Sequence, residues 1–350
     1  MKPLSDQQRL FLVESDQLYR AWREVMWRHD DYRFGIYWKT VKGRDYLVRL
    51  NDHAGHGRSL GVRSDATELI YEEFVAGKAL AKSKYDGVKA RLLSQARLNQ
   101  ATRLGRMPHV IAEVLQRLDQ VHALSDLRVV GTHALYAYEA MAAVELRMDL
   151  LASGDVDLLF DARKQVSILA KKFEGNGLLG LLKKVDKTFE VSGADPFRAI
   201  NRDGFMVDFI TQDRGMLSPK PALLSQNDLA LVEIANLEWL ANSPRVETVV
   251  ISAKGVPVMM PVADPRAFMI HKVWLSNRYD REPVKKQRDL NQARMVLDLL
   301  DAYLPHYPLN TDELRYFPKQ VVQAALRQLN KFSGEDRQWL EGSPVGNELI

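Results

Sequence analysis

The feature that most constrains this chain is residues 129–161, where an apolar strand, a helical segment and a second strand follow one another. The first strand ends in Gly131-Thr132, and the second begins with Asp155 and Asp157, one residue apart. Because side chains alternate along a strand, both aspartates lie on one face of the expected sheet. Two such close carboxylates repel each other unless a cation lies between them. The pattern predicts a site for a hard divalent cation, Mg²⁺ or Mn²⁺, because such ions prefer oxygen ligands.

A third carboxylate is available in residues 205–210, an apolar run that Asp208 alone interrupts. An aspartate in a buried strand costs free energy unless a cation lies beside it. We therefore expect Asp208 to join Asp155 and Asp157 as a metal ligand. Gly131 lets the backbone approach a triphosphate, the following helix offers free amide donors, and Thr132 adds a hydroxyl.

None of these motifs is specific when taken alone. A strand followed by Gly-Thr and a helix is common in α/β proteins, and Asp155 and Asp157 could equally belong to a turn after Gly154. The order of the three motifs along the chain is what indicates a catalytic site. In that site Asp155, Asp157 and Asp208 are the candidate catalytic residues.

This order of motifs resembles the nucleotidyltransferase superfamily of the DNA polymerase β type. Residues 106–161, with VVGTHALYAYEA and GDVDLLFD, resemble a bacterial family of stand-alone nucleotidyltransferase-fold proteins, and so do the upstream pieces YWK, DYLVR and GVRSDATE. One departure is that 22 residues separate Thr132 from Asp155, more than in minimal members of the superfamily. The resemblance implies a nucleoside triphosphate as substrate and transfer of its nucleoside monophosphate.

A second group of residues lies further along, in residues 271–290. Lys272, Arg278 and a basic segment that ends in Asp289 resemble the pattern of nucleotidyltransferase toxins of the abortive-infection type. The resemblance implies that Lys272, as a catalytic residue, and Arg278 bind the triphosphate, while Asp289 orients one of them. The alternative is an ordinary solvated helix face, on which lysine, arginine and acids are common.

We expect an α+β fold with a polymerase β-type nucleotidyltransferase core, a mixed sheet flanked by helices. The expected domains are a helical and β-hairpin region with a basic helix, the catalytic core and a C-terminal helical domain, at residues 1–108, 109–263 and 264–350. Periodicity predicts helices at residues 5–30, 65–81, 82–106, 110–124, 164–173 and from 265 to the end. It predicts strands at residues 33–39, 45–50, 127–131, 155–160, 188–191, 196–201, 204–211, 246–252 and 256–260. Residues 51–63, with three glycines, are expected to form a loop.

The composition narrows the class of protein. With 49 lysines and arginines against 45 acids, the formal net charge is only +4, so a nucleic-acid site must be a local patch. The absence of cysteine excludes disulfides and fits a reducing cytoplasm, which is the expected location. No apolar run has the length of a membrane span, so no membrane partner is expected. His53 and His56 have metal-like spacing, but no further ligands accompany them, and a zinc site is rejected.

The acceptor of the nucleotide stays open at this stage. Residues 82–106 carry seven lysines and arginines and one acid, which suits a phosphate backbone such as the 3′ end of a tRNA, although a scaffold helix with a basic exterior has the same pattern. A serine, threonine or tyrosine hydroxyl of a protein is the other acceptor considered. The resemblance also suggests a toxin restrained by a cognate antitoxin. Two other functions are considered for the protein: non-catalytic binding of a nucleotide or a partner, and enzymatic modification of small molecules.

Overall fold

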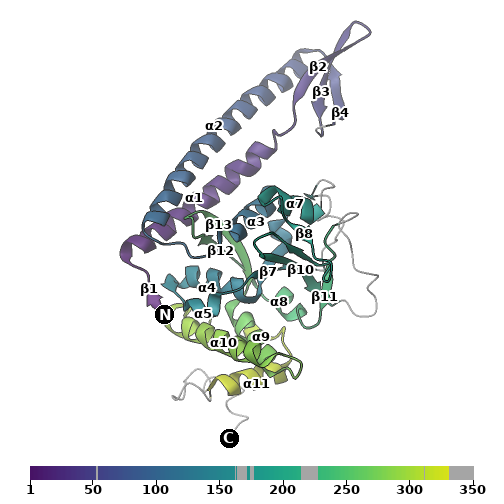
Figure 1. The fold of residues 1–350 in the computed structure, drawn as a ribbon. Helices are drawn as coiled ribbons and strands as arrows, with labels where there is room; N and C mark the ends of the chain where they lie inside the picture. Colours follow the sequence, from purple (N-terminus) through teal and green to yellow (C-terminus); the bar gives the residue numbers. More distant parts are fainter. Residues whose placement is uncertain are drawn as a thin grey trace.

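A computed structural model describes residues 1–52, 54–161, 163, 172–173, 177–213, 228–310 and 312–330. Figure 1 shows a long arm, a central sheet with its helices, and a C-terminal group of helices packed below the sheet. The helix predicted at residues 164–173 lies almost wholly outside the described residues, and so does the C-terminal end of the chain.

The central sheet mixes parallel and antiparallel pairs. In spatial order it contains β12 (Arg245–Ile251), β13 (Pro257–Ala263), β5 (Leu127–Val130), β7 (Asp155–Phe160), β10 (Met206–Gln212), β9 (Arg198–Ile200) and β8 (Glu190–Val191). A further strand, β11 (Val232–Ile234), pairs in parallel with β10. The pairs β13–β5 and β7–β10 are parallel, while β5–β7 and β10–β9 are antiparallel. The structure is thus a mixed sheet with flanking helices, which is consistent with the predicted α+β fold.

Helices surround this sheet. They are α3 (His109–Gln120), α4 (Leu135–Ala142), α5 (Met148–Leu151), α7 (Gly177–Val185) and α8 (Glu238–Asn242). A two-stranded pairing of β1 (Lys2–Pro3) with β6 (Val144–Glu145) holds the N-terminus against the core. Strands β5 and β13 are buried along their whole length because apolar side chains occupy both faces, and β7 and β10 are buried except where they reach the site.

The C-terminal part contains α9 (Pro265–Asn277), α10 (Pro283–Tyr303) and α11 (Lys319–Asn330). The first helix begins as the sequence predicts, since the Asp264 side chain accepts a hydrogen bond from the Arg266 amide and proline occupies the first turn. Helices α9 and α10 pack against each other, and α10 also contacts α4 and α5. This packing brings residues 272–292 close to the C-terminal end of β5.

The arm consists of α1 (Asp6–Asp30), α2 (Asp65–Ala101) and a small sheet at its tip. Two predictions about this region are wrong. Residues 65–101 form one continuous helix, because Gly77 and Gly87 within it do not interrupt the backbone hydrogen bonds. Residues 51–63 include a strand, β4 (Gly57–Val62), which pairs with β3 (Arg44–Leu50) of the predicted hairpin, whose other strand is β2 (Ile36–Val41). Among the described helices, including the long α2, none combines the length and apolar content that crossing a membrane requires.

Candidate active site

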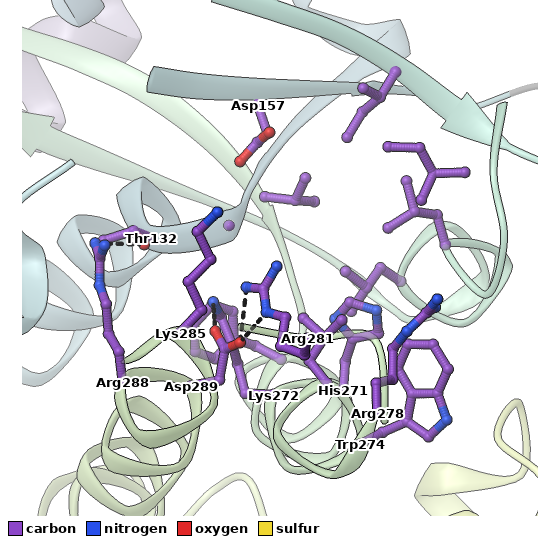
Figure 2. Close-up of a pocket in the computed structure, with 18 of the residues that line it drawn as sticks. Thr132, Asp157, His271, Lys272, Trp274, Arg278, Arg281, Lys285, Arg288 and Asp289 are labelled. Carbon is purple, nitrogen blue, oxygen red and sulfur yellow. Dashed lines mark hydrogen bonds and ion pairs between the residues drawn. The ribbon is translucent and has the colours of Figure 1, made fainter. Parts of the chain in front are cut away.

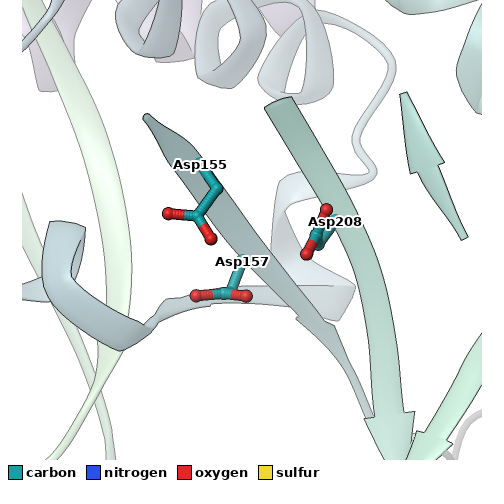
Figure 3. A group of neighbouring side chains, drawn as sticks. All are labelled: Asp155, Asp157 and Asp208. Carbon is teal, nitrogen blue, oxygen red and sulfur yellow. The ribbon is translucent and has the colours of Figure 1, made fainter. Parts of the chain in front are cut away.

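The three predicted metal ligands come together through the register of two parallel strands. Asp208 on β10 lies directly opposite Asp157 on β7, and Asp155 lies two residues before Asp157 on the same face. One ligand oxygen from each carboxylate lies within 4.8 Å of the others (Figure 3). This is a donor set of hard oxygen atoms, the kind that fits Mg²⁺ or Mn²⁺.

The next strand of the sheet after β10 is β9. In its register with β10, Arg198 lies opposite Asp208. Its Nε and Nη2 atoms donate to the two carboxylate oxygens of Asp208 at 2.7 and 2.6 Å, a bidentate pair. This hydrogen bonding raises the pKa of Arg198. Nη1 of Arg198 also lies 3.2 Å from Asp195, so the guanidinium has a second carboxylate partner. The guanidinium of Arg198 therefore balances the negative charge of the buried Asp208.

The carboxyl group of Asp157 lies between the other two carboxylates and the Lys272 side of the site. Burial, together with the neighbouring Asp155 and Asp208 charges, raises the pKa of Asp157 to about 7. Lys272 and Arg198 act in the opposite direction but do not compensate. Desolvation and like charges penalise the ionised form, so this position favours a bound cation.

Gly131 and Thr132 lie beside these carboxylates, because Val130 on β5 is the register partner of Asp157 on β7. The chain leaves β5 in a short 3₁₀ turn, Gly131–Ala134, and continues into α4. The Thr132 oxygen accepts hydrogen bonds from Nη2 of Arg288 at 3.0 Å and from Nε2 of Gln292 at 3.2 Å. Both partners are donors, so the Thr132 hydroxyl keeps its own proton to donate to a ligand.

Lys272 and Asp289 form a buried ion pair, with Lys272 Nζ 2.7 Å from Asp289 Oδ1. Arg281 binds the other carboxylate oxygen of Asp289 through Nε at 2.9 Å (Figure 2). Burial lowers the pKa of Lys272, and the adjacent Asp289 counters this shift. Asp289 thus contacts Lys272 and not Arg278, whose guanidinium instead pairs with Asp280 at 2.5 and 2.8 Å.

Asp155, Asp157, Gly131, Thr132 and the cationic residues around Asp289 line one pocket of about 330 Å³, whereas Asp208, Arg198 and Gln292 are not in its lining. Thr132 and Arg288 lie at one end of the pocket, and Trp274 and Arg278 lie at the other (Figure 2). The apolar part of the lining includes Ile210, Ile234, Leu237, Leu240, Phe268 and Leu275 as well as Trp274. Five lysines and arginines also line the pocket: Lys272, Arg278, Arg281, Lys285 and Arg288. The pocket thus has the apolar and cationic parts that a base and a triphosphate need.

The sequence reasoning did not single out Arg198, Arg281, Arg288 and Gln292. Arg281 and Arg288 lie in the same basic segment as Asp289, but nothing in their spacing shows that one binds Asp289 and the other reaches Thr132. Arg288 and Thr132 are 156 positions apart in the sequence. For Arg198 the only signal was indirect: an aspartate buried in an apolar strand needs a cation, but that need does not identify which residue supplies it.

Replacing Gly131 with alanine is expected to reduce catalysis by about 100-fold. Gly131 has a φ of +66°, and a Cβ atom there would lie 2.2 Å from Oδ2 of Asp157, so the carboxylate must move. Gly43→Ala is the matched control, because Gly43 has a φ of +75° with nothing within 4 Å of the added carbon. Both variants carry the same backbone strain, and only Gly131→Ala should lose nucleotidyl transfer measured at equal folded concentration. Equal activity of the two variants would contradict the placement of Asp157.

His271, which stacks on Trp274 in the pocket wall, is expected to make stability depend on pH. Burial lowers the pKa of His271 to about 3, whereas an unfolded histidine titrates near 6.5. The stabilisation from keeping it neutral is therefore complete above pH 6.5 and is lost as the pH falls towards 3. Between pH 7 and pH 5 wild type should lose about 2 kcal/mol more than His271→Phe in urea unfolding. Parallel losses in both proteins would show that His271 is not held neutral.

A protein-family model described as Nucleotidyltransferase matches residues 109–316, more than half of the chain. The match includes the three carboxylates, the Gly131-Thr132 turn and the Lys272–Asp289 pair. No curated protein and no solved structure matches the chain. The chain therefore belongs to this nucleotidyltransferase family and is a nucleotidyltransferase enzyme.

Proposed function

We propose that this enzyme transfers a nucleoside monophosphate from a nucleoside triphosphate to a hydroxyl group, in a metal-dependent reaction of the polymerase β type. The observation that carries the proposal is one pocket in which Asp155 and Asp157, with Asp208 in register beside them, face the cationic wall around Lys272. Nucleotidyl transfer needs carboxylates that bind a divalent metal ion. It also needs lysine or arginine side chains on the opposite wall that bind the phosphates.

In this proposal Asp155, Asp157 and Asp208 hold Mg²⁺ or Mn²⁺. When bound, the metal ion stabilises charge on the phosphates and lowers the pKa of the acceptor hydroxyl. The Thr132 hydroxyl donates to a phosphate oxygen, and the amides of the turn after β5 do the same. The apolar lining around Trp274 holds the base.

The bond changes follow from this placement. The acceptor oxygen forms a bond to the α-phosphorus, and the bond from that phosphorus to the bridging oxygen of the β-phosphate breaks. Asp208 accepts the proton of the acceptor hydroxyl, and pyrophosphate leaves. Lys272 and Arg288 neutralise the charge that develops on pyrophosphate.

The acceptor proposed here is RNA, with the 3′ end of a tRNA as the model substrate and a protein hydroxyl as the alternative. The basic surface of α2 favours RNA: from Lys78 to Arg97 the helix carries six lysines and arginines against the single acid Asp86. Arg106, which belonged to the predicted basic segment, is not part of this surface, because it pairs with Glu139 at 2.8 Å. A toxin role and a cognate antitoxin stay predictions from the sequence resemblance.

The acceptor class is tested by incubating the protein with each α-labelled triphosphate, Mg²⁺ and a cell extract. The products are then treated with RNase or with protease. We expect a labelled product that RNase destroys and protease leaves intact. Label that only protease removes would show a protein acceptor and contradict the RNA proposal.

A second candidate function is nucleotide binding without turnover, and one observation favours it. Arg198 engages both oxygens of Asp208, so the third carboxylate is already paired. Such a protein would retain labelled triphosphate in a filter-binding assay while producing no pyrophosphate with any acceptor. Release of pyrophosphate that depends on Asp208 excludes this candidate.

A further inference from the structure

A second cavity, of about 490 Å³, lies between the arm and the core, and it shares no lining residue with the pocket described above. Its walls come from the end of α1, from α2, from α3 and from α7. Its described lining holds five lysines and arginines, Arg33, Lys89, Arg117, Lys172 and Lys184, and the single acid Asp30. The cavity is therefore strongly cationic.

Three of these cations are available for a ligand. Lys172 is already paired with Asp126. Lys89 lies over the Tyr85 ring at 5.5 Å, and Arg117 donates only to the neutral Gln120 at 3.1 Å. Among the described residues no ion pair joins Lys89, Arg117 or the exposed Lys184 to a carboxylate. These three positive charges come from three different helices and face one cleft.

The cleft is preformed because a buried polar network fixes the arm to the core. Asp119 of α3 accepts hydrogen bonds from the Tyr19 hydroxyl at 3.0 Å and from Arg23 Nε at 2.9 Å, both on α1. Asn99 near the end of α2 donates to the Gly255 carbonyl at 2.9 Å. These contacts hold the walls of the cleft in place. Binding of a ligand therefore does not require free energy to bring the cations together.

The positive charge extends beyond the cleft along α2. Lys78 and Lys82 lie on the same face of this helix as Lys89, so the charge on that face extends over about 16 Å. A small anion could occupy the cleft but could not engage the whole stretch. A polymer with a regularly repeated phosphate charge engages both, since a nucleic acid carries about one phosphate per 3.4 Å of each strand.

We propose that the cleft between arm and core binds the phosphate backbone of a nucleic acid, contacted by Lys89, Arg117 and Lys184. The cleft lies near the N-terminal end of β5, where Arg117 of α3 precedes this strand, and Gly131 of the active site follows its C-terminal end. The cleft and the active site thus lie towards opposite ends of β5, a buried strand of four residues about 13 Å long. A nucleic acid that extends from the cleft around the core is the acceptor in this proposal. This last step rests on the proposed function, whereas binding in the cleft does not.

The test measures binding without turnover. A fluorescein-labelled RNA hairpin with a single-stranded 3′ tail is titrated with protein in fluorescence anisotropy, at several salt concentrations and without nucleotide. The triple variant Lys89→Glu, Arg117→Glu, Lys184→Glu should bind at least about tenfold more weakly than wild type, with a shallower salt dependence. The control triple variant Arg202→Glu, Lys254→Glu, Lys319→Glu makes the same charge change at exposed positions outside the cleft and should bind like wild type.

Other outcomes overturn the proposal. If wild-type protein does not bind the hairpin, or if the cleft variant binds it as tightly as wild type does, the cleft is not a nucleic-acid site. If poly-glutamate binds as tightly and through the same three residues, the cleft is a site for acidic protein and the nucleic-acid proposal fails. Asp157→Asn should bind the hairpin normally, so a failure of the catalytic proposal is distinguished from a failure of this one. Thermal unfolding of each variant excludes misfolding as the cause.

Discussion

Replacing Asp157 with asparagine should reduce nucleotidyl transfer by about a thousandfold or more. Asparagine keeps the size of the side chain but removes the negative charge at the centre of the row formed with Asp155 and Asp208. The variant should also be more stable in metal-free buffer at neutral pH because like-charge repulsion is relieved. Its free energy of unfolding, measured in urea, should rise by about 1 kcal/mol. Loss of activity together with a gain of stability is the signature of a functional carboxylate.

The control is Asp149→Asn, which removes an exposed carboxylate outside the pocket. It should change neither activity nor stability by a measurable amount, since an exposed ion pair contributes little. An Asp157→Asn protein that retains most of the activity would contradict the assignment of the metal site. Reduced stability of the same variant would show that Asp157 has a structural role instead.

Replacing Asp289 with asparagine should destabilise the protein by about 3–5 kcal/mol. Asp289 is 2% exposed and Lys272 is 5% exposed, so removing the carboxylate leaves a buried ammonium without a counter-ion. Arg281 loses its carboxylate partner at the same time. Urea unfolding at pH 7 measures the change.

Two further variants separate the charge effect from packing. Lys272→Met combined with Asp289→Leu removes both charges and should recover most of the lost stability, while transfer activity stays lost because the phosphates lose a cation. Asp280→Asn is the matched control: it breaks the exposed pair with Arg278, and it should cost no more than about 0.5 kcal/mol. An Asp289→Asn protein as stable as the control would contradict the buried ion pair.

The sequence alone was sufficient to predict which carboxylates meet, but not how. Strand alternation places Asp155 and Asp157 on one face, and the cost of an unpaired buried aspartate points to Asp208. The close approach of Asp208 depends on β10 pairing in parallel and in register with β7, which is a tertiary fact. The same register places Arg198 opposite Asp208, and no local pattern indicates a partner on a strand of only three residues.

The contacts among the charged residues of α9 and α10 were even less predictable from the sequence. Lys272 and Asp289 could be proposed together from a family pattern, but their hydrogen bond needs α9 and α10 to pack side by side. The contact of Arg288 with Thr132 needs α10 to return to the end of β5. Long-range packing of this kind leaves no periodic signal in one sequence.

In the arm, local patterns misled in two opposite ways. Glycines predicted a loop at residues 51–63, yet Gly57 and Gly61 lie in a strand, where Gly57 has the Arg49 carbonyl so close that a side chain would collide with it. For residues 65–106 the sequence predicted two helical segments, 65–81 and 82–106, where the structure has the single helix α2. Packing against α1 supports this long helix.

The measurement that tests the central claim most directly compares two labels on the same triphosphate. Wild-type protein, Mg²⁺ and acceptor RNA are incubated with α-labelled or γ-labelled nucleotide, and the label in the RNA and in pyrophosphate is counted. Nucleotidyl transfer predicts α-label in the RNA and γ-label in released pyrophosphate. Transfer of the γ-label to the RNA would show a kinase, and retention of intact triphosphate on the protein would show a binding protein; either result contradicts the account.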